Sequence, residues 1–238
     1  MNTRIGVMAR APSSCGKTRL SPHLSPARLA TLRAALLTDT LHALSPLDNV
    51  TVFFTPHAAE QEISSLCGTA ISRVPQGEGD LGARMLRALQ HLIVASGAGF
   101  LDSSGAGFPD SSGAGLQACE SAILVGSDIP LLTADHIREA AELLRSANRV
   151  VLGPADDGGY YLIGMTEPHA GLIEGIEWGT ESVLTDTLRA ADRLGHDARL
   201  LRSAYDIDTI DDLQRLERDL KWAPSAVCPA MRRWLSEG

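Results

Sequence analysis

Lysine is nearly absent from this chain of 238 residues, which carries two lysines, Lys17 and Lys221, against nineteen arginines. Basic side chains as a whole are outnumbered, by 29 acidic to 21 basic, and the formal net charge is −8. Because binding along DNA or RNA requires a basic face, this charge argues against a nucleic-acid partner and makes any phosphate site local. Aromatic residues make up only 4% of the chain, which also disfavours base-stacking platforms.

Long hydrophobic runs are missing as well. No stretch approaches the about 18 to 20 apolar residues of a membrane-spanning helix, so we expect a cytoplasmic protein without a membrane span. The four cysteines form no C-x-x-C pair, which argues against a zinc knuckle or a redox motif. Zinc hydrolysis, serine hydrolysis and Rossmann hydride transfer lack their motifs too, because H-E-x-x-H, G-x-S-x-G and a G-x-G-x-x-G after the first strand do not occur.

Short β-type runs alternate with helical patterns along the chain. Ser25 is a good N-cap for the first helix, with Pro26 in its first turn, and leucines at helical spacing follow. This alternation predicts an α/β protein, a three-layer α/β/α sandwich with a mostly parallel sheet. The expected strands cover residues 5–9, 50–54, 71–74, 122–125 and 150–152. Of the expected helices, the first begins after Ser25 and the second covers residues 58–66. The third follows a glycine-rich turn at residues 76–82 and ends at about residue 95, and the fourth extends from Thr133 to about residue 147.

Residues 97–115 interrupt this alternation with a tandem eight-residue repeat rich in glycine, alanine and serine. Small and polar residues cannot offset their ordering entropy by burial, so we expect a flexible surface insertion without chemistry of its own. The sequence otherwise predicts a single domain over residues 1–222, followed by a C-terminal tail over residues 223–238.

A phosphate-binding segment follows the first strand. Residues 11–18 fit a relaxed Walker A pattern with alanine in place of the first glycine, but two prolines within nine residues of Lys17 argue against the long helix of a true P-loop. Arg10, Lys17 and Arg19 still place three cations past the C-terminal end of the strand, where open α/β sheets bind ligands. A phosphate site is therefore one interpretation, and a solvated turn with incidental charges is the other.

Two acidic motifs are candidates for metal binding and catalysis. Asp128 follows the strand at 122–125 and would project over the sheet edge, where it can hold a hard divalent cation, although it could equally cap a turn. Asp157 lies between a second acid and paired glycines, which suggests either a carboxylate directed into a site or a hairpin turn.

A third acidic motif precedes the last predicted helix. Thr209 and Asp212 have the spacing of a capping box for that helix. Capping leaves Asp206 and Asp208 without a role, and in an extended segment these two residues face the same side.

In series, these motifs resemble a known family: the bacterial glycosyltransferase-A-like transferases called radical-SAM/selenodomain-associated transferase 1. That family is similar in turn to 2-phospho-L-lactate guanylyltransferases and molybdenum-cofactor nucleotidyltransferases. Five ordered blocks span about residues 4 to 220. They are Ala9-Arg10-Ala11-Pro12 with Lys17-Thr18-Arg19-Leu20, Gln76 with Asp80-Leu81-Gly82 and Arg84-Met85, Gly126-Ser127-Asp128 with Pro130, Pro154 with Asp157 to Leu162, and Asp206 to Thr209.

The resemblance implies a nucleotide-diphospho-sugar transferase fold with a sugar-nucleotide or nucleoside triphosphate site at the C-terminal edge of the sheet. It implies that the cation is Mg²⁺ or Mn²⁺ and that Asp128 and Asp208 are its ligands, with Lys17, Asp128 and Asp157 as catalytic residues. The residues implied in nucleotide binding are Arg10, Lys17, Arg19, Gln76, Gly79 and Leu81.

The resemblance favours a metal-dependent glycosyltransferase that uses a nucleotide-sugar donor and a small-molecule acceptor. Nucleotidyl transfer from a nucleoside triphosphate to a phosphorylated acceptor is the alternative, because the motif at Asp128 offers one carboxylate where a full D-x-D motif offers two. A nucleotide-binding module without turnover is a third hypothesis, for which we expect dispersed carboxylates.

Overall fold

A seven-stranded sheet forms the centre of the molecule, in the order β3-β2-β1-β4-β6-β5-β7. The computed structural model describes residues 3–94, 121–146 and 148–237, so the predicted insertion at 97–115 lies outside the described residues. All neighbouring strands pair in parallel except β6, which is antiparallel to β4 and to β5. The strands are β1 (Thr3–Arg10), β2 (Val50–Thr55), β3 (Ser72–Pro75), β4 (Ser121–Gly126), β5 (Arg149–Pro154), β6 (Tyr160–Met165) and β7 (Asp197–Leu200).

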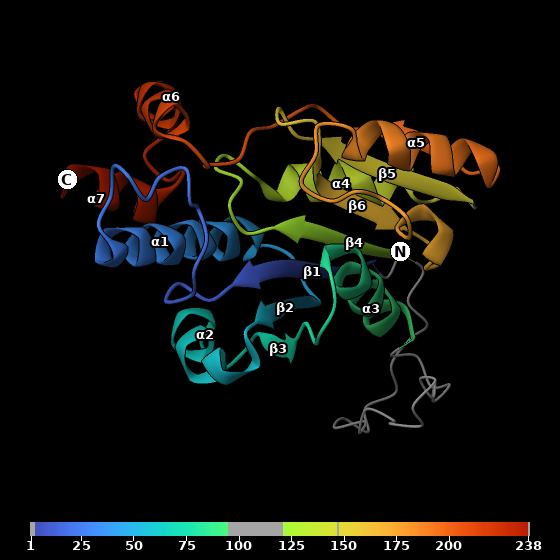
Figure 1. The fold of residues 1–238 in the computed structure, drawn as a ribbon, viewed down its shortest axis with the longest axis horizontal. Helices are drawn as coiled ribbons and strands as arrows, with labels where there is room; N and C mark the ends of the chain where they lie inside the picture. Colours follow the sequence, from blue (N-terminus) through green and yellow to red (C-terminus); the bar gives the residue numbers. More distant parts are fainter. Residues whose placement is uncertain (1–2, 95–120, 147, 238) are drawn as a thin grey trace.

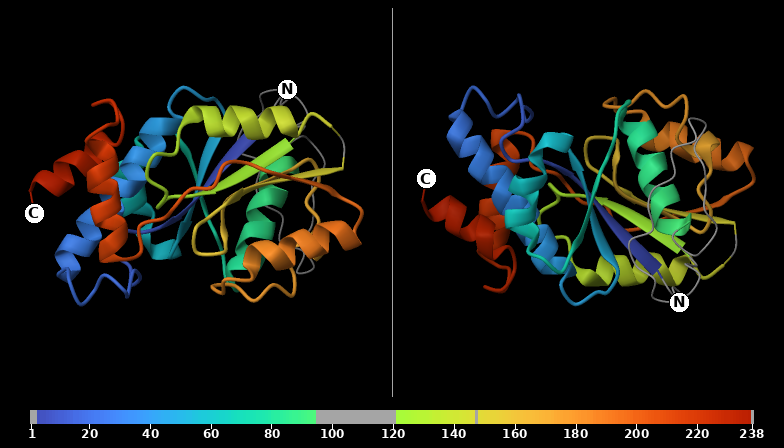
Figure 2. Two further views of the ribbon diagram at one scale, coloured as in Figure 1. Left: turned by 90° about the horizontal axis from the view of Figure 1, so that it is seen from above. Right: turned by 90° about the horizontal axis from the view of Figure 1, so that it is seen from below.

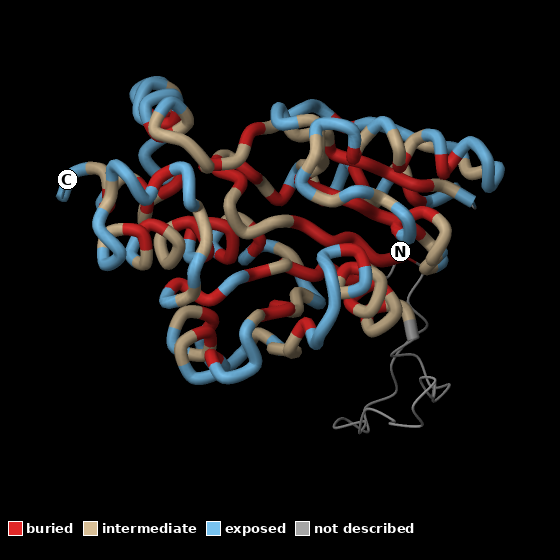
Figure 3. The backbone as a smooth tube through the Cα atoms, in the orientation of Figure 1, coloured by how far each residue is buried: buried red, intermediate tan, exposed pale blue. Residues whose placement is uncertain are grey.

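Helices cover both faces of this sheet, which confirms the predicted three-layer α/β fold (Figure 2). Side chains from α1, α2 and α4 share one buried core with one face of the sheet, and side chains from α3 and α5 share a second core with the other face. The inner strands of the sheet and the inward sides of the helices are buried, whereas the outer sides of the helices are exposed (Figure 3). The helices are α1 (Pro26–Leu44), α2 (Glu60–Cys67), α3 (Leu81–Val94), α4 (Ala134–Leu143), α5 (Val183–Arg193), α6 (Ile210–Leu220) and α7 (Pro229–Ser236), with short 3-10 turns at His57–Ala59 and Ala170–Leu172.

Helix α1 begins as the sequence predicts. The hydroxyl of Ser25 accepts a hydrogen bond from the backbone N–H of Arg28 at 3.2 Å, and Pro26 occupies the first turn. The predicted capping box of α6 also forms: the Asp212 carboxylate accepts from the backbone N–H of Thr209 at 2.7 Å. These caps satisfy amide groups that have no partner inside their helices.

Other boundaries differ from the expected ones. The helix predicted to run to about residue 147 ends at Leu143, because the chain turns sharply before β5, with Asn148 in a left-handed conformation at φ 59°. Strand β7 was not predicted; it is a short edge strand of largely exposed residues, and such strands lack a clear hydrophobic alternation.

Helix α7 lies within the segment expected to be a tail. Its Met231 and Trp234 are buried in a third core together with α1 and α6 (Figure 1). The Asp39 carboxylate, on α1, accepts hydrogen bonds from the backbone N–H groups of Ala230 and Met231, both at 2.8 Å. Residues 223–238 therefore include a helix that is packed and capped, while the division of the chain at residue 222 stays a prediction.

Asp39→Ala is expected to lower the free energy of unfolding by about 1 to 2 kcal/mol, because it removes the N-terminal cap of α7. Asp211→Ala is a matched control, because Asp211 is exposed in the first turn of α6; it should change stability by less than about 0.5 kcal/mol. Urea unfolding of both variants measures the difference. Equal stability of the two variants would show that the Asp39 contacts do not anchor α7.

Candidate functional site

The candidate site lies at the edge of the sheet where its parallel strands end. Strands β1 and β4 are parallel neighbours, and from their C-terminal ends the chain leads in opposite directions along the strand order: through α1 to β2 from β1, and through α4 to β5 from β4. Such a switch point leaves a crevice in which α/β proteins bind ligands. Because β6 runs antiparallel, the β5–β6 hairpin lies at this same edge, as does the segment that follows β7.

The loop after β1 consists of turns, and α1 begins only at Pro26. This agrees with the prediction that the segment is not a true P-loop. Gly16 and Lys17 both have positive φ angles, 149° and 51°, of which the second is rare for a residue with a side chain. The loop is tied to its surroundings by Glu62 on α2, which accepts hydrogen bonds from the backbone N–H of Ser13 at 2.8 Å and from its hydroxyl at 2.6 Å.

The Lys17 side chain crosses from this loop to the other side of the crevice. Its ammonium Nζ donates to Asp128 Oδ2 at 3.2 Å, to Asp208 Oδ1 at 3.1 Å and to the backbone carbonyl of Ile207 at 2.5 Å. The lysine side chain is only 9% exposed, whereas the two carboxylates are 40% and 39% exposed. The structure thus brings together two residues that lie 111 positions apart in the chain and that the sequence analysis placed in one site.

The charge of Lys17 is stabilised by its two carboxylate partners. Burial alone would lower the pKa of this lysine, but the charges of Asp128 and Asp208 and their hydrogen bonds raise it above its ordinary value. Lys17 is therefore a protonated, buried cation at neutral pH.

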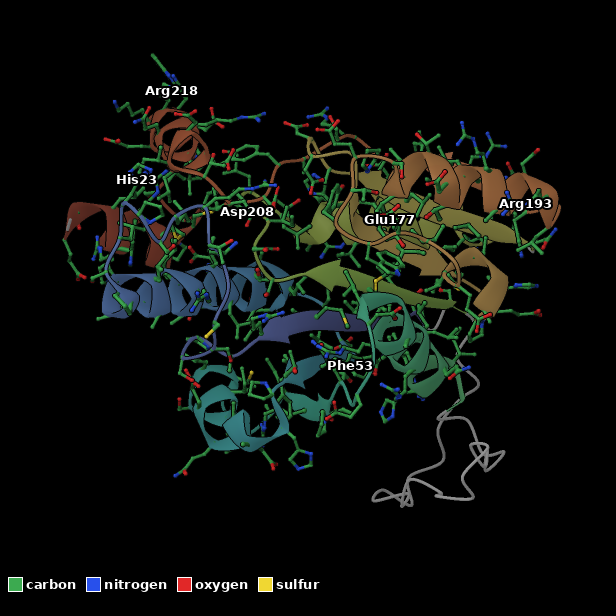
Figure 4. The ribbon with its side chains drawn as sticks, viewed as in Figure 1. His23, Phe53, Glu177, Arg193, Asp208 and Arg218 are labelled. Atoms are coloured by element: carbon green, nitrogen blue, oxygen red, sulfur yellow. The ribbon has the colours of Figure 1, made fainter. Side chains whose placement is uncertain are left out.

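Three carboxylates converge beside this cation. One oxygen from each of Asp128, Asp206 and Asp208 lies within 4.8 Å of the others. A backbone hydrogen bond joins the segment after β4, which carries Asp128, to the segment before α6, which carries Asp206 and Asp208: the N–H of Ile207 donates to the carbonyl of Asp128 at 3.2 Å. In Figure 4, Asp208 lies in the segment that leads from the sheet edge to α6. Convergent carboxylate oxygens are the ligands that hard divalent cations prefer.

Asp206 is the member of this group to which the sequence analysis gave no role. Burial, together with the charges of Asp128, Asp208 and Asp157, raises the pKa of Asp206 to about 6. The signal for it was present in the sequence, because an extended segment directs Asp206 and Asp208 to the same side. Asp157, by contrast, acts on Asp206 through its charge but does not belong to the group of three.

A cavity of about 240 Å³ lies between the loop, α1 and the end of β4. Its lining includes both cationic and anionic side chains, which suits a ligand that is bound through both a metal cation and phosphate groups. The lining residues are Arg10, Gly16, Lys17, Arg33, Leu36, Ser127, Asp128 and Asp208.

The remaining predicted nucleotide-binding residues lie at the same edge but outside the lining of this cavity. Arg19 is exposed on the turn that follows Lys17. Gln76 is buried, and its Nε2 donates to the carbonyls of Ala9 at 3.1 Å and Phe53 at 2.9 Å, so this amide links the ends of β1 and β2. Gly79, at φ 104°, and the 46% exposed Leu81 lie where the chain enters α3.

Asp157 lies in the turn of the β5–β6 hairpin. Its exposed carboxylate Oδ1 accepts from the backbone N–H of Gly159 at 2.9 Å, so the hairpin interpretation describes its conformation. Gly158 follows with φ 87°, and a Cβ atom there would lie 2.3 Å from the carbonyl oxygen of Glu181. Close backbone contact with the segment before α5 thus requires glycine at this position.

Gly158→Ala is expected to lower the free energy of unfolding by about 2 to 4 kcal/mol, because it adds both a strained φ and a backbone collision. Gly175→Ala is the matched control: Gly175 has φ 77° but open space at its Cβ position. It should cost only about 1 kcal/mol. Chemical unfolding measures both variants, and equal losses would mean that the contact with Glu181 is not tight.

Comparison with known proteins assigns the chain to a family. Residues 37–180 match the model of the family described as "Uncharacterized protein conserved in bacteria (DUF2064)", and the chain belongs to this family. No curated protein matches the chain. Among the described residues, no helix has the length and apolar character that crossing a bilayer requires.

Solved structures confirm the fold class. One similar structure, named a "putative nucleotide-diphospho-sugar transferase", comes from Desulfovibrio desulfuricans G20. It is 25% identical, with a TM-score of 0.82, over 99% of this chain and 94% of that chain. The 4-diphosphocytidyl-2C-methyl-D-erythritol synthase of Anaerococcus prevotii DSM 20548 is 12% identical, with a TM-score of 0.54, over 92% and 96% of the two chains. The inositol-1-phosphate CTP transferase of T. maritima is 11% identical, with a TM-score of 0.52, over 98% and 97%. The last two show a shared fold alone.

Proposed function

We propose that this protein is a metal-dependent transferase that takes a nucleotide-diphospho-sugar as donor and transfers the sugar to a small acceptor. The observation that carries this proposal is the convergence of the Lys17 ammonium with the carboxylates of Asp128, Asp206 and Asp208 at the switch point of the sheet. Breaking a sugar–diphosphate bond builds negative charge on the leaving group. A positioned cation and a lysine are the groups that stabilise such charge.

The donor set fits a hard divalent cation, Mg²⁺ or Mn²⁺. Asp128, Asp206 and Asp208 would hold it, because each offers a carboxylate oxygen within 4.8 Å of the others. When bound, the cation would neutralise charge on the diphosphate of the leaving group. Asp206 thus extends the pair of ligands expected from the sequence to three.

Lys17 would exchange partners when donor and cation bind. In the structure its ammonium compensates Asp128 and Asp208. With a cation held by those carboxylates, the ammonium would be free to pair with a phosphate oxygen, together with Arg10, which lines the same cavity. Arg19 would contribute a further cation at the mouth of the site. Gln76, Gly79 and Leu81 would lie near the base or ribose, and Asp157 would contact the acceptor or accept its proton.

Nucleotidyl transfer is the second candidate, and one observation favours it. The motif after β4 offers the single carboxylate of Asp128, and the other two carboxylates of the group of three, Asp206 and Asp208, come from a separate segment before α6. In this version an acceptor phosphate attacks the α-phosphorus of a nucleoside triphosphate and pyrophosphate leaves. The convergence of the carboxylates disfavours a binding module without turnover, for which dispersed carboxylates are expected.

The experiment is a thermal-shift panel of UDP-sugars, GDP-sugars, GTP and CTP, each with Mn²⁺ and Mg²⁺. A ligand at 100 times its Kd stabilises the folded state by about 2.7 kcal/mol, enough to rank the panel. We expect stabilisation by a sugar nucleotide, and release of a nucleoside diphosphate once an acceptor is present. Stabilisation by nucleoside triphosphates alone, with pyrophosphate release, would reverse the choice between the two reactions. No stabilisation by any member would overturn both.

A further inference from the structure

Arg33, on α1, contacts the loop that carries Lys17. Its Nη1 donates to the carbonyls of Pro12 at 2.7 Å and Ser14 at 2.6 Å, and its Nη2 donates to the carbonyl of Gly16 at 2.6 Å. One guanidinium thus binds three carbonyls within five consecutive residues, ending at the residue before Lys17. Arg33 also lines the 240 Å³ cavity.

These contacts determine which way the loop's peptide groups face. In a trans peptide the C=O and the following N–H point in opposite directions. Carbonyls directed at Arg33 therefore turn the next amides away from it. The N–H of Ser13 shows the effect, because it is directed to the Glu62 carboxylate at 2.8 Å. By the same geometry the N–H groups of Cys15 and Lys17 face away from Arg33, in a loop with positive φ angles that resembles an anion-binding nest.

The cost of this arrangement shows that it is specific. Burial and the charge of Arg10 both lower the pKa of Arg33, because each makes the charged form of the guanidinium less favourable. The three carbonyl dipoles offset that cost. Arg10 adds a fourth contact with a carbonyl of the same loop, to Cys15 at 3.0 Å.

We infer that Arg33 is a positioning residue: its guanidinium holds residues 12–16 so that Lys17 projects onto Asp128 and Asp208 and the loop can receive a diphosphate. This inference rests on the proposed function for its diphosphate part. A lysine cannot replace Arg33, because one ammonium lacks the planar fork that reaches three carbonyls at once.

The two lysines of the chain make a direct test possible. Selective ¹⁵N labelling of lysine gives NMR signals from the side-chain ammonium groups of Lys17 and Lys221 alone, so the environment of Lys17 can be observed without interference. Arg33→Met is expected to shift the Lys17 signal toward that of an exposed lysine and to leave Lys221 unchanged. Arg33→Lys should shift the Lys17 signal in the same direction by a smaller amount, and it provides a second variant should Arg33→Met fail to fold.

The matched control is Arg28→Met on the same helix. Arg28 stacks on Trp234 of α7, 3.8 Å from the ring centroid, and also donates to the carbonyl of that residue, so its loss disturbs α1 without touching the loop. It should lower stability but leave the Lys17 signal unchanged. Unchanged Lys17 signals in both Arg33 variants, or an equal shift in Arg28→Met, would overturn the positioning role.

Titration calorimetry with Mn²⁺ alone, and with inorganic pyrophosphate in the presence of Mn²⁺, tests the link to function. In Arg33→Met we expect the Kd for pyrophosphate to rise about tenfold or more, while the Kd for Mn²⁺ does not rise, because displacing Lys17 frees the carboxylates of Asp128 and Asp208. An unchanged Kd for pyrophosphate would overturn this part of the inference. If the wild-type protein binds no pyrophosphate, the proposed function fails, whereas the NMR result still decides whether Arg33 positions Lys17.

Discussion

Asp128→Asn is expected to lose Mn²⁺-dependent nucleotide binding, with the Kd for Mn²⁺ rising by about 100-fold or more. The substitution keeps the shape of the side chain but removes one of three negative charges and weakens the group of carboxylates that would hold the cation. The same change leaves Lys17 with Asp208 as its remaining carboxylate partner. Isothermal titration with Mn²⁺, followed by titration with pyrophosphate, measures both effects.

Asp135→Asn provides the control for Asp128→Asn. It also removes one carboxylate, but from an exposed ion pair with Arg138 on α4, and Asp135 belongs neither to the group of three carboxylates nor to the lining of the cavity. Its Kd values should equal those of the wild-type protein. If Asp128→Asn folds cooperatively and binds Mn²⁺ and pyrophosphate as tightly as this control, then Asp128 is a turn residue and not a metal ligand.

Lys17→Met should change the affinities for metal and for phosphate in opposite directions. Loss of the ammonium leaves the carboxylates of Asp128 and Asp208 without their cationic partner, so Mn²⁺ should bind about tenfold more tightly. Pyrophosphate should bind at least about tenfold more weakly, because a buried phosphate partner is gone. Without metal the variant should also unfold more easily, by about 1 to 3 kcal/mol, since the partly exposed acids are left unpaired.

The control for Lys17→Met is Lys221→Met, which removes the other lysine, an exposed residue at the end of α6. Calorimetry and urea unfolding, each with and without Mn²⁺, compare the two variants. If Mn²⁺ and pyrophosphate affinities fall together in Lys17→Met, the lysine supports the metal site instead of competing for its ligands, and the exchange of partners proposed above is wrong.

Much of the sheet and the location of the site could be predicted because short-range and topological rules dominate there. The apolar run before Asp128 forms buried β4, and the prolines that follow Lys17 delay α1 until Pro26. The carboxyl ends of parallel strands meet at one edge, so Lys17 and Asp128 could be expected together. Their contact confirms that expectation about geometry, while their roles in chemistry stay predictions.

What could not be predicted depends on long-range packing. Arg33 looks like an ordinary helix arginine in the sequence, and only the folded loop brings three carbonyls to it. The sequence indicates that Asp206 and Asp208 face the same side, but their approach to Asp128 depends on the backbone hydrogen bond between Ile207 and Asp128, which no local pattern predicts. Helix α7 is likewise stabilised by Asp39, about 190 residues earlier in the chain, because its own eight residues would not form a stable helix alone.

A crystal structure with Mn²⁺ and pyrophosphate is the most direct test of the account. We predict an anomalous Mn²⁺ peak bound by Asp128, Asp206 and Asp208, with pyrophosphate between that peak and the Lys17 ammonium. An Mn²⁺ ion elsewhere, or pyrophosphate bound away from Lys17 while its ammonium keeps the contacts with Asp128 and Asp208, would contradict it.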